Sequence, residues 1–296
     1  MKGIITVIKI FAVLSVLGIL GALILFLRNF QKDFAQPMED RKERLGNLIE
    51  KSKETTFKRG EREFNRAVEL IAMERLDDAR EKLLFIQNLH ADSEFGYEAR
   101  RILGEINLDE LLSVENMANK KIHTVKPGES YIKIAQQHRT TLDCIMFLNG
   151  LLDAKQLHPG DEMIVMSLDY KLVVDLSGMR VALFHRDLDR KEHVFAKGYP
   201  ILKFNLPNLG SHSIHTKISS KVGEVNGRSY QPIRSNYRNG TKILGMKAAR
   251  RNIQLRPLPK IADVDQGDGI FLSVSTMEEL AMLIRVGNEV EIKPAK

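Results

Sequence analysis

The chain has 296 residues and only one cysteine, Cys144. A single cysteine excludes an intrachain disulfide, so the redox compartment of the protein cannot be read from it. The sequence also lacks zinc-ligand spacing, a helix with clustered arginines and an aromatic platform on which bases could stack. We therefore expect no metal, no cofactor and no nucleic-acid partner. The net charge of +7 suits anionic lipid headgroups or cell-wall polymers as well as it suits nucleic acid.

Near the carboxyl terminus, Gln266–Leu280 reads Q-G-D-G-I-F-L-S-V-S-T-M-E-E-L. This segment resembles the L,D-transpeptidase signature S-H-G-C-I-R-L-S-N-x-D-x-x-E-L. In that family a cysteine attacks a peptide carbonyl, a histidine activates it and an arginine helps to hold the site. The matching positions here are Gly269, Gly267 and Phe271. Glycine has no side chain that could attack or accept a proton, so we predict a transpeptidase-like fold with no catalytic residue.

Other segments resemble motifs of the same family in the same order. They are Lys171–Phe184, which alternates as a hairpin about Ser177-Gly178, then Gly210–Ile214, Gly240–Met246 and Arg285–Ile292. The segment Ile253–Arg256 lies about where the family places another active-site histidine, and Gln254 stands at that position. The resemblance predicts a mostly-β, degenerate L,D-transpeptidase-like domain over residues 170–296.

A divergent transpeptidase with another nucleophile is the alternative reading of this domain. Cys144 lies in an amphipathic run in a different module, where a small buried thiol is the expected role. Ser273 is expected to cap a helix or end a strand. His212 and His215 are three apart in a strand-like run, so they point to opposite faces and are read as structural or surface residues.

Upstream, His123–Val165 resembles a LysM module almost end to end, from H-T-V-K-P-G-E-S through the central L-N-G-L to the closing P-G-D-E-M-I-V. The resemblance implies a strand, two helices and a strand over residues 120–168. Ser130 is placed to cap the first helix, and Asn149-Gly150 to end the second with residues that tolerate positive φ. About 45 residues is near the lower size limit for independent folding.

LysM modules bind N-acetylglucosamine-containing glycans, such as those of peptidoglycan, between two loops. The matching positions predicted to contact the glycan are Gly128, Glu129, Ser130, Tyr131, Asn149, Gly150, Leu151 and Leu152. Glu129 and Tyr131 replace the usual aspartate and leucine of the family. A structural reading stays open, in which Ser130 and Asn149 are only caps and Leu151 only belongs to the core.

The amino terminus contains Ile10–Leu27, an uncharged run whose length nearly spans a hydrocarbon core at about 1.5 Å per residue. No small-x-small cleavage site follows it, which favours an uncleaved single-pass anchor over residues 1–27. The basic residues after the run outnumber those before it and argue for a cytoplasmic carboxyl half. The LysM resemblance argues the reverse. Because large domains are translocated with little regard to charge, we expect residues 28–296 in the periplasm or extracytoplasmic space.

Between anchor and LysM module, residues 28–60 predict a charged helical stalk interrupted at Pro37. Residues 61–118 resemble one tetratricopeptide repeat with a second helix starting at Leu76, followed by a helix over Phe95–Leu112. An ordinary helical hairpin that packs on its neighbours is an equal alternative, because repeat arrays need about three units. A helical region of this kind suits an adaptor for envelope proteins.

The sequence thus predicts a multi-domain α+β protein: transmembrane helix, helical hairpin, βααβ LysM module and mostly-β domain. The sequence predicts a membrane-anchored cell-envelope protein that binds peptidoglycan through the LysM module. Its catalytically degenerate last domain is predicted to act in binding or as a scaffold. A divergent transpeptidase and an adaptor localised by LysM are the two alternatives.

Overall fold

The structure is a computed structural model that describes residues 58–295 except 153, 155, 188–191, 207–211, 249–250 and 260–267. The predicted membrane anchor and nearly all of the predicted stalk lie outside the described residues. Across the described part of the chain, no helix is long and apolar enough to cross a membrane. Residues from Arg59 onward form one compact unit.

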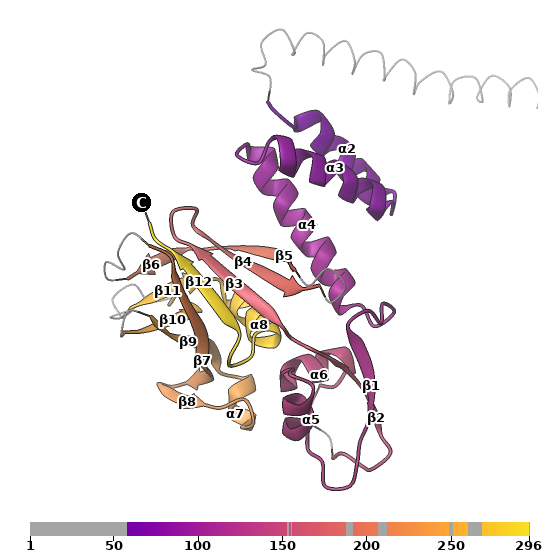
Figure 1. The fold of residues 1–296 in the computed structure, drawn as a ribbon, viewed down its shortest axis with the longest axis vertical. Coiled ribbons are helices and arrows are strands. Elements are labelled where there is room, and N and C mark those ends of the chain that lie inside the picture. Colours follow the sequence, from indigo (N-terminus) through magenta and orange to yellow (C-terminus); the bar gives the residue numbers. More distant parts are fainter. Residues whose placement is uncertain are drawn as a thin grey trace, which may run out of the picture. The chain divides into compact units, whose positions relative to one another are not determined.

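Three helices begin this unit: α2 (Glu61–Ala72), α3 (Leu76–Leu89) and α4 (Glu94–Leu112) (Figure 1). The Ser93 hydroxyl accepts a hydrogen bond from Gly96 N at 3.0 Å, which caps α4 as expected for serine before a helix. The starts of α2 and α3 agree with the sequence prediction. Their shared core consists of Ala67, Leu83, Ile86, Ala99 and Leu103.

The predicted βααβ module is present as β1 (Lys120–Thr124), α5 (Tyr131–Gln137), α6 (Leu142–Leu148) and β2 (Glu162–Met166). Strands β1 and β2 pair antiparallel. Ser130 caps α5 and Thr141 caps α6, each through its hydroxyl. A small core of Val125, Ile134, Ala135, Ile145, Met163 and Val165 fills the module.

The carboxyl-terminal domain is rich in strand, as predicted. Its strands are β3 (Tyr170–Asp175), β4 (Arg180–Arg186), β5 (His193–Pro200), β6 (Lys203–Asn205), β7 (Ile214–Val225), β8 (Arg228–Tyr230), β9 (Thr241–Ala248), β10 (Arg251–Pro257), β11 (Gly269–Leu272) and β12 (Glu289–Lys293). Within the described residues, the sheet order is β5-β4-β3-β12-β7-β9-β10-β11-β6, with β8 beside β7. The helices are α7 (Ser235–Arg238) and α8 (Val274–Leu283). Only the pairs β3–β12 and β10–β11 are parallel among these described strands.

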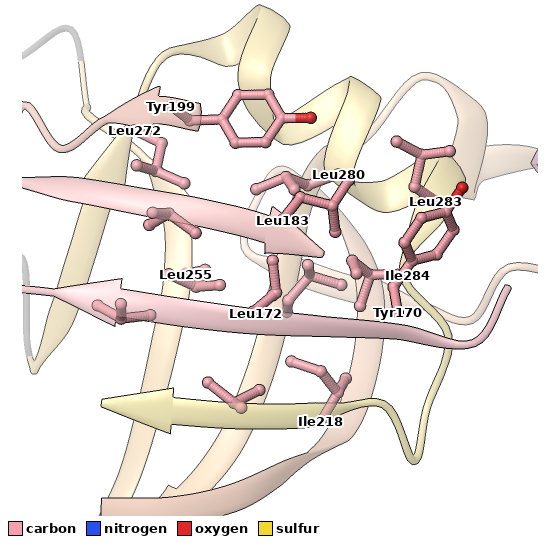
Figure 2. Close-up of a cluster of buried hydrophobic side chains, with 14 of the residues drawn as sticks. Tyr170, Leu172, Leu183, Tyr199, Ile218, Leu255, Leu272, Leu280, Leu283 and Ile284 are labelled. Atoms are coloured by element: carbon pink, nitrogen blue, oxygen red, sulfur yellow. The ribbon is translucent and has the colours of Figure 1, made fainter. Parts of the chain in front are cut away.

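One face of the strongly bent sheet packs on α8. Figure 2 shows Leu280, Leu283 and Ile284 from the α8 region directed at buried residues of the strands. The strand residues include Leu172, Leu183, Leu255 and Leu272, all with no exposed surface. Alternation along β3 and β4 explains this arrangement, because successive residues of a strand point to opposite faces.

The predicted hairpin at Lys171–Phe184 is confirmed as β3 and β4. In the segment Arg285–Ile292, which resembles the closing motif of the family, residues 289–292 lie in β12. The four residues before it form a turn in which Gly287 has φ +95° and Asn288 Oδ1 accepts from Arg285 N at 2.7 Å. Asn288 Nδ2 also donates to the Leu168 carbonyl at 2.9 Å, so the amide holds the turn against the start of β3.

The LysM module and the helices share a core with the sheet. Cys144 and Leu148 of α6, and Leu108 and Leu112 of α4, belong to the same buried cluster as the sheet residues. Helix α6 therefore has two buried sides: Ile145 fills the small module core, whereas Cys144 and Leu148 fill the larger one. Without the sheet domain, the module would expose this second side to water.

A buried polar network crosses the same contact. The Lys221 ammonium on β7 donates to Asp143 Oδ2 of α6 at 3.0 Å and to the Ala281 carbonyl of α8. The Tyr237 hydroxyl donates to the same Asp143 oxygen at 3.2 Å. Burial lowers the pKa of Lys221 and the Asp143 carboxylate opposes that shift. The ammonium, with 4% of its side chain exposed, depends on this carboxylate for charge compensation.

Asp143→Asn should therefore destabilise the whole unit. Neutralising the carboxylate leaves Lys221 buried without its counter-ion, and we expect the free energy of unfolding to fall by about 2 kcal/mol. Urea unfolding followed by circular dichroism measures the change. Glu98→Gln is the matched control: Glu98 forms an exposed pair with Arg101, so its loss should cost less than about 0.5 kcal/mol. Equal small losses in both variants would show that the network does not hold the module.

Candidate functional site

The first loop of the predicted glycan groove is shaped by Gly128 and Glu129. Gly128 has φ +77°, in the left-handed region, and a Cβ there would meet nothing within 4 Å. The Glu129 carboxylate accepts from Lys126 N at 2.9 Å and lies 2.8 Å from His123 Nε2. The hydrogen bond from Lys126 N, aided by His123, lowers the pKa of Glu129. Its oxygens thus hold the loop.

Behind this loop lies a histidine pair that the sequence analysis did not single out. His138 Nε2 is 3.0 Å from His123 Nδ1, and the rings meet edge to face. When His123 Nε2 donates to Glu129, its Nδ1 is the acceptor, so His138 Nε2 is the donor. Burial lowers the pKa of His138, and His123 and Lys121 add to this shift while Glu129 opposes it. The pair braces the end of α5 against β1.

The second loop of the predicted groove contains one residue with a structural role and two that are accessible to a ligand. The Asn149 amide donates to the Ile145 and Ile164 carbonyls at 2.7 and 2.9 Å, and its oxygen accepts from Ile164 N at 2.8 Å. Asn149 therefore ties α6 to β2. Gly150 has φ +61° with open space around it, and Leu152 is 92% exposed. Of this loop, Gly150 and Leu152 are free to meet a ligand.

The two predicted loops meet over the module core. Tyr131 from the first loop and Leu151 from the second pack on the same buried cluster, both partly exposed. Burial, with the nearby Asp161, raises the pKa of Tyr131, whereas Arg238 opposes the shift. These contacts bring the predicted residues into one surface, to which Ser130 adds an exposed hydroxyl.

Arg238 is a member of this surface that the sequence analysis missed. It belongs to α7 of the sheet domain, and its Nη1 donates to the Leu152 carbonyl at 3.2 Å. Its Nη2 lies 2.9 Å from the Met146 sulfur. No local pattern could have found it, because the sequence assigns Arg238 and Leu152 to different domains. The predicted groove therefore has a basic edge supplied by the sheet domain.

The transpeptidase-like positions lie side by side on β10 and β11. Gln254 and Gly269 are direct partners in the parallel register, and Arg256 is opposite Phe271. Phe271 has no exposed surface. Gly267 lies outside the described residues. The structure thus brings together Gln254 and Gly269, two of the positions that match catalytic residues of the family. At the position that matches the family's arginine, it has the buried ring of Phe271.

The space at Gly269 is closed. A Cβ on this residue would lie 3.2 Å from the Gln254 carbonyl oxygen, 3.6 Å from the Phe271 ring and 3.8 Å from Arg256 Cδ. The Arg256 Nη1 donates to Gln254 Oε1 at 3.4 Å, so these two side chains of β10 face each other. An open pocket of about 350 Å³ lies instead on the other side of Gln254, lined by β7, β9 and β10.

The other candidate nucleophiles occupy structural positions. Cys144 has no exposed surface, and burial raises the pKa of its thiol to about 11. Ser273 caps α8 by accepting from Thr276 N at 3.0 Å, as the sequence predicts. His212 and His215 are exposed at the surface. A thiol that is neutral and buried is a poor nucleophile.

With this geometry in view, comparison with known proteins assigns the module. Residues 123–165 match the LysM domain family. The matched segment runs from β1 to β2 and includes both loops of the predicted groove. A search of curated proteins finds no match.

Solved structures similar to the chain include L,D-transpeptidases. The enzyme from Stackebrandtia nassauensis is 13% identical with a TM-score of 0.28, over 52% of this chain and 68% of that one. L,D-transpeptidase 1 from Mycobacterium tuberculosis is 11% identical with a TM-score of 0.26, over 60% and 82%.

A fused Zn-dependent amidase/peptidase/peptidoglycan-binding domain-containing protein from Clostridium acetobutylicum ATCC 824 is 10% identical with a TM-score of 0.29, over 42% of this chain. The chain spans about half of that protein's length, 51%. Because these TM-scores are low, we conclude nothing about the sheet domain from them. Its interpretation depends on the sequence motifs described above.

Proposed function

We propose that this chain binds peptidoglycan through its LysM module. The observation that carries the proposal is the LysM match over residues 123–165. The two loops between which modules of this family hold N-acetylglucosamine-containing glycans are open here at Gly128 and Gly150. Small residues at left-handed positions leave backbone amides and carbonyls accessible to acetamido and hydroxyl groups.

The sheet domain, in this proposal, is a degenerate L,D-transpeptidase-like domain that binds or scaffolds. Acyl transfer needs a nucleophile, a proton acceptor and an oxyanion donor set that act as a unit. Gln254, Gly269 and Phe271 supply neither nucleophile nor base at the matching described positions, and Gly267 stands at the fourth. A domain that has kept the frame around these positions retains surfaces for binding.

Two alternatives have less support. A divergent transpeptidase would need another nucleophile, and the two candidates considered, Cys144 and Ser273, are respectively buried and engaged in capping. An adaptor built on the helical region would use the surface of α3, which leaves Leu84, Phe85 and Leu89 exposed. Nothing in the described residues identifies what would cover them.

Peptidoglycan retention tests the proposal at Gly150. In Gly150→Trp, a large side chain at φ +61° distorts the turn and fills the surface between the loops, so retention should fall about tenfold, equivalent to about 1.4 kcal/mol. The full chain in detergent is sedimented with purified peptidoglycan. Gly160→Trp is the matched control, since Gly160 also has positive φ and open space but lies outside the predicted contacts. Equal retention by both variants would remove Gly150 from the site, and no sedimentation of the native chain would remove the function.

Membrane anchoring by residues 1–27, with the remainder outside the cytoplasm, is part of the same proposal. It is motivated by the uncharged run Ile10–Leu27 and by the extracytoplasmic ligand of LysM. A reporter that is active only outside the cytoplasm, fused after Lys296, should be active, and the protein should stay with membranes after a high-salt wash. Activity of a cytoplasm-only reporter instead would reverse the orientation and leave the module without its ligand.

We also expect the chain to have no transpeptidase activity. The native chain and Gly269→Cys should both form no product from tetrapeptide-bearing muropeptides and an acceptor. One restored thiol lacks a base, and it would sit against the Gln254 carbonyl. Mass spectrometry of the muropeptides measures cross-links, with heat-inactivated protein as the blank and an active L,D-transpeptidase as the positive control. Product that a point change within residues 170–293 abolishes would establish the enzyme alternative.

A further inference from the structure

A pocket of about 180 Å³ lies where the LysM module meets the sheet domain, beside the starts of β3 and β12. Its charged lining residues are four cations and two carboxylates, namely Arg139, Arg186, Lys217 and Arg285 with Asp169 and Glu289. With His193 neutral, these residues give the described lining a net charge of +2. We call it the basic pocket. None of the residues predicted to contact the glycan lines it.

The carboxylate of Asp169 fixes two guanidinium groups at this pocket. Arg139 Nη2 and Arg285 Nη2 each lie 2.8 Å from Asp169 Oδ1. Arg285 Nε also donates to the Leu168 carbonyl at 3.2 Å, so this side chain is held from two directions. One carboxylate neutralises only one of the two cations. The pair therefore keeps a positive charge, and it is already ordered before a ligand arrives, which lowers the entropy lost on binding.

Two residues with left-handed backbone shape the pocket wall. Arg139 has φ +52°, and its carbonyl accepts a hydrogen bond from Leu168 N at 2.9 Å. This conformation is uncommon for a residue other than glycine and has to be held by its surroundings. Gly287 has φ +95°, and a Cβ there would lie 3.5 Å from Arg285 Nη1. The glycine thus leaves free the space beside this guanidinium.

Arg186 and Lys217 supply the other two cations of the basic pocket. Both residues are exposed, and neither side chain forms an ion pair or hydrogen bond within the described part of the chain. Glu289 is the cross-strand neighbour of Lys217 in the β7–β12 pair. Arg186 ends β4 and Lys217 lies in β7, so both approach the pocket from elements other than those that carry the fixed arginine pair.

We propose that the basic pocket binds a phosphate group. A phosphate monoester carries nearly two negative charges at neutral pH and presents three acceptor oxygens. Its charge therefore balances the net charge of the lining, whereas one carboxylate would leave half of that charge uncompensated. Three oxygens can accept from donors on several elements, and the planar guanidinium group matches the geometry of phosphate oxygens. Free phosphate and the headgroup of an anionic phospholipid share this chemistry and are the two sources to distinguish.

Calorimetric titration of the full chain with inorganic phosphate, in uncharged detergent at low salt, tests the pocket. Phosphate should bind at one site and about tenfold more tightly than acetate, because acetate brings a single charge and only two oxygens. Added sodium chloride should weaken the binding, since salt screens the attraction between the anion and the exposed cations.

Two variants place the anion in the basic pocket. Arg186→Gln and Lys217→Gln should each reduce the phosphate affinity about tenfold, because each removes a charge-assisted donor. Neither residue has a side-chain partner among the described residues, so the melting temperature without phosphate should not change. Arg228→Gln on β8 and Lys247→Gln on β9 are the matched controls. Both positions are exposed cations outside the pocket, and both variants should keep the native affinity.

Phosphatidic acid added to the detergent micelles identifies the source of the phosphate group. If a lipid headgroup fills the basic pocket, the apparent affinity for inorganic phosphate should fall in these micelles. It should not fall in micelles with oleate, which carry negative charge without phosphate. Equal affinity in both kinds of micelle would assign the pocket to a soluble phosphate.

The inference is overturned if the native chain binds no phosphate in plain micelles. It is also overturned if the two pocket variants and their two controls bind phosphate equally well, because the attraction would then come from the overall charge of the protein. Neither result bears on the proposed glycan binding, since peptidoglycan sedimentation tests that separately.

Discussion

The carboxylate of Asp143 is the interaction on which the arrangement of this unit depends. It lies on a LysM helix, yet it compensates a lysine of the sheet domain and accepts a tyrosine hydroxyl from α7. A buried ammonium without such a partner would be strongly unfavourable. The module therefore stabilises the sheet domain by supplying the carboxylate that compensates this lysine. Cys144, beside Asp143 in the sequence, is buried in the same contact.

This contact gives the module a role beyond that of an appended binding domain. The second buried side of α6 packs into the large core, and Thr141 Oγ1 donates to the Met282 carbonyl at the end of α8 at 2.5 Å. The arrangement leaves a pocket of about 680 Å³ between the helices of the module and the sheet domain, and it brings Arg238 to the glycan groove. Packing that stabilises the pair of domains therefore also shapes the glycan groove and this pocket.

The helical region is joined to the sheet in a similar way. Lys197 of β5 donates to Glu105 of α4 at 2.6 Å and to Glu279 of α8 at 2.9 Å, while Tyr199 donates to Glu279 at 2.5 Å. Gly104 allows the close approach, since a Cβ there would lie 3.1 Å from the Lys197 Cα. Half of α4 thus belongs to the helical core and half to the sheet domain, which favours a packed hairpin over an independent repeat array.

Local features of this chain were readable from its sequence. The caps at Ser130 and Ser273, the left-handed glycine at Gly150 and the start of α3 follow from residue preferences within a few positions. The LysM order of elements came from the resemblance to that family, and β1, α5, α6 and β2 confirm it. The glycine at position 269 was equally visible, because its meaning depends only on a missing side chain.

What the tertiary structure alone decided are the contacts between residues far apart in the chain. Asp143 and Lys221 are separated by 78 positions, and Arg238 reaches a loop 86 positions earlier. The same holds for the turn before β12, where Asn288 donates to a carbonyl 120 positions away. Periodicity and capping report only on neighbours along the chain, whereas the pocket between the module and the sheet domain, the basic edge of the groove and the closed space at Gly269 arise from how separate elements pack.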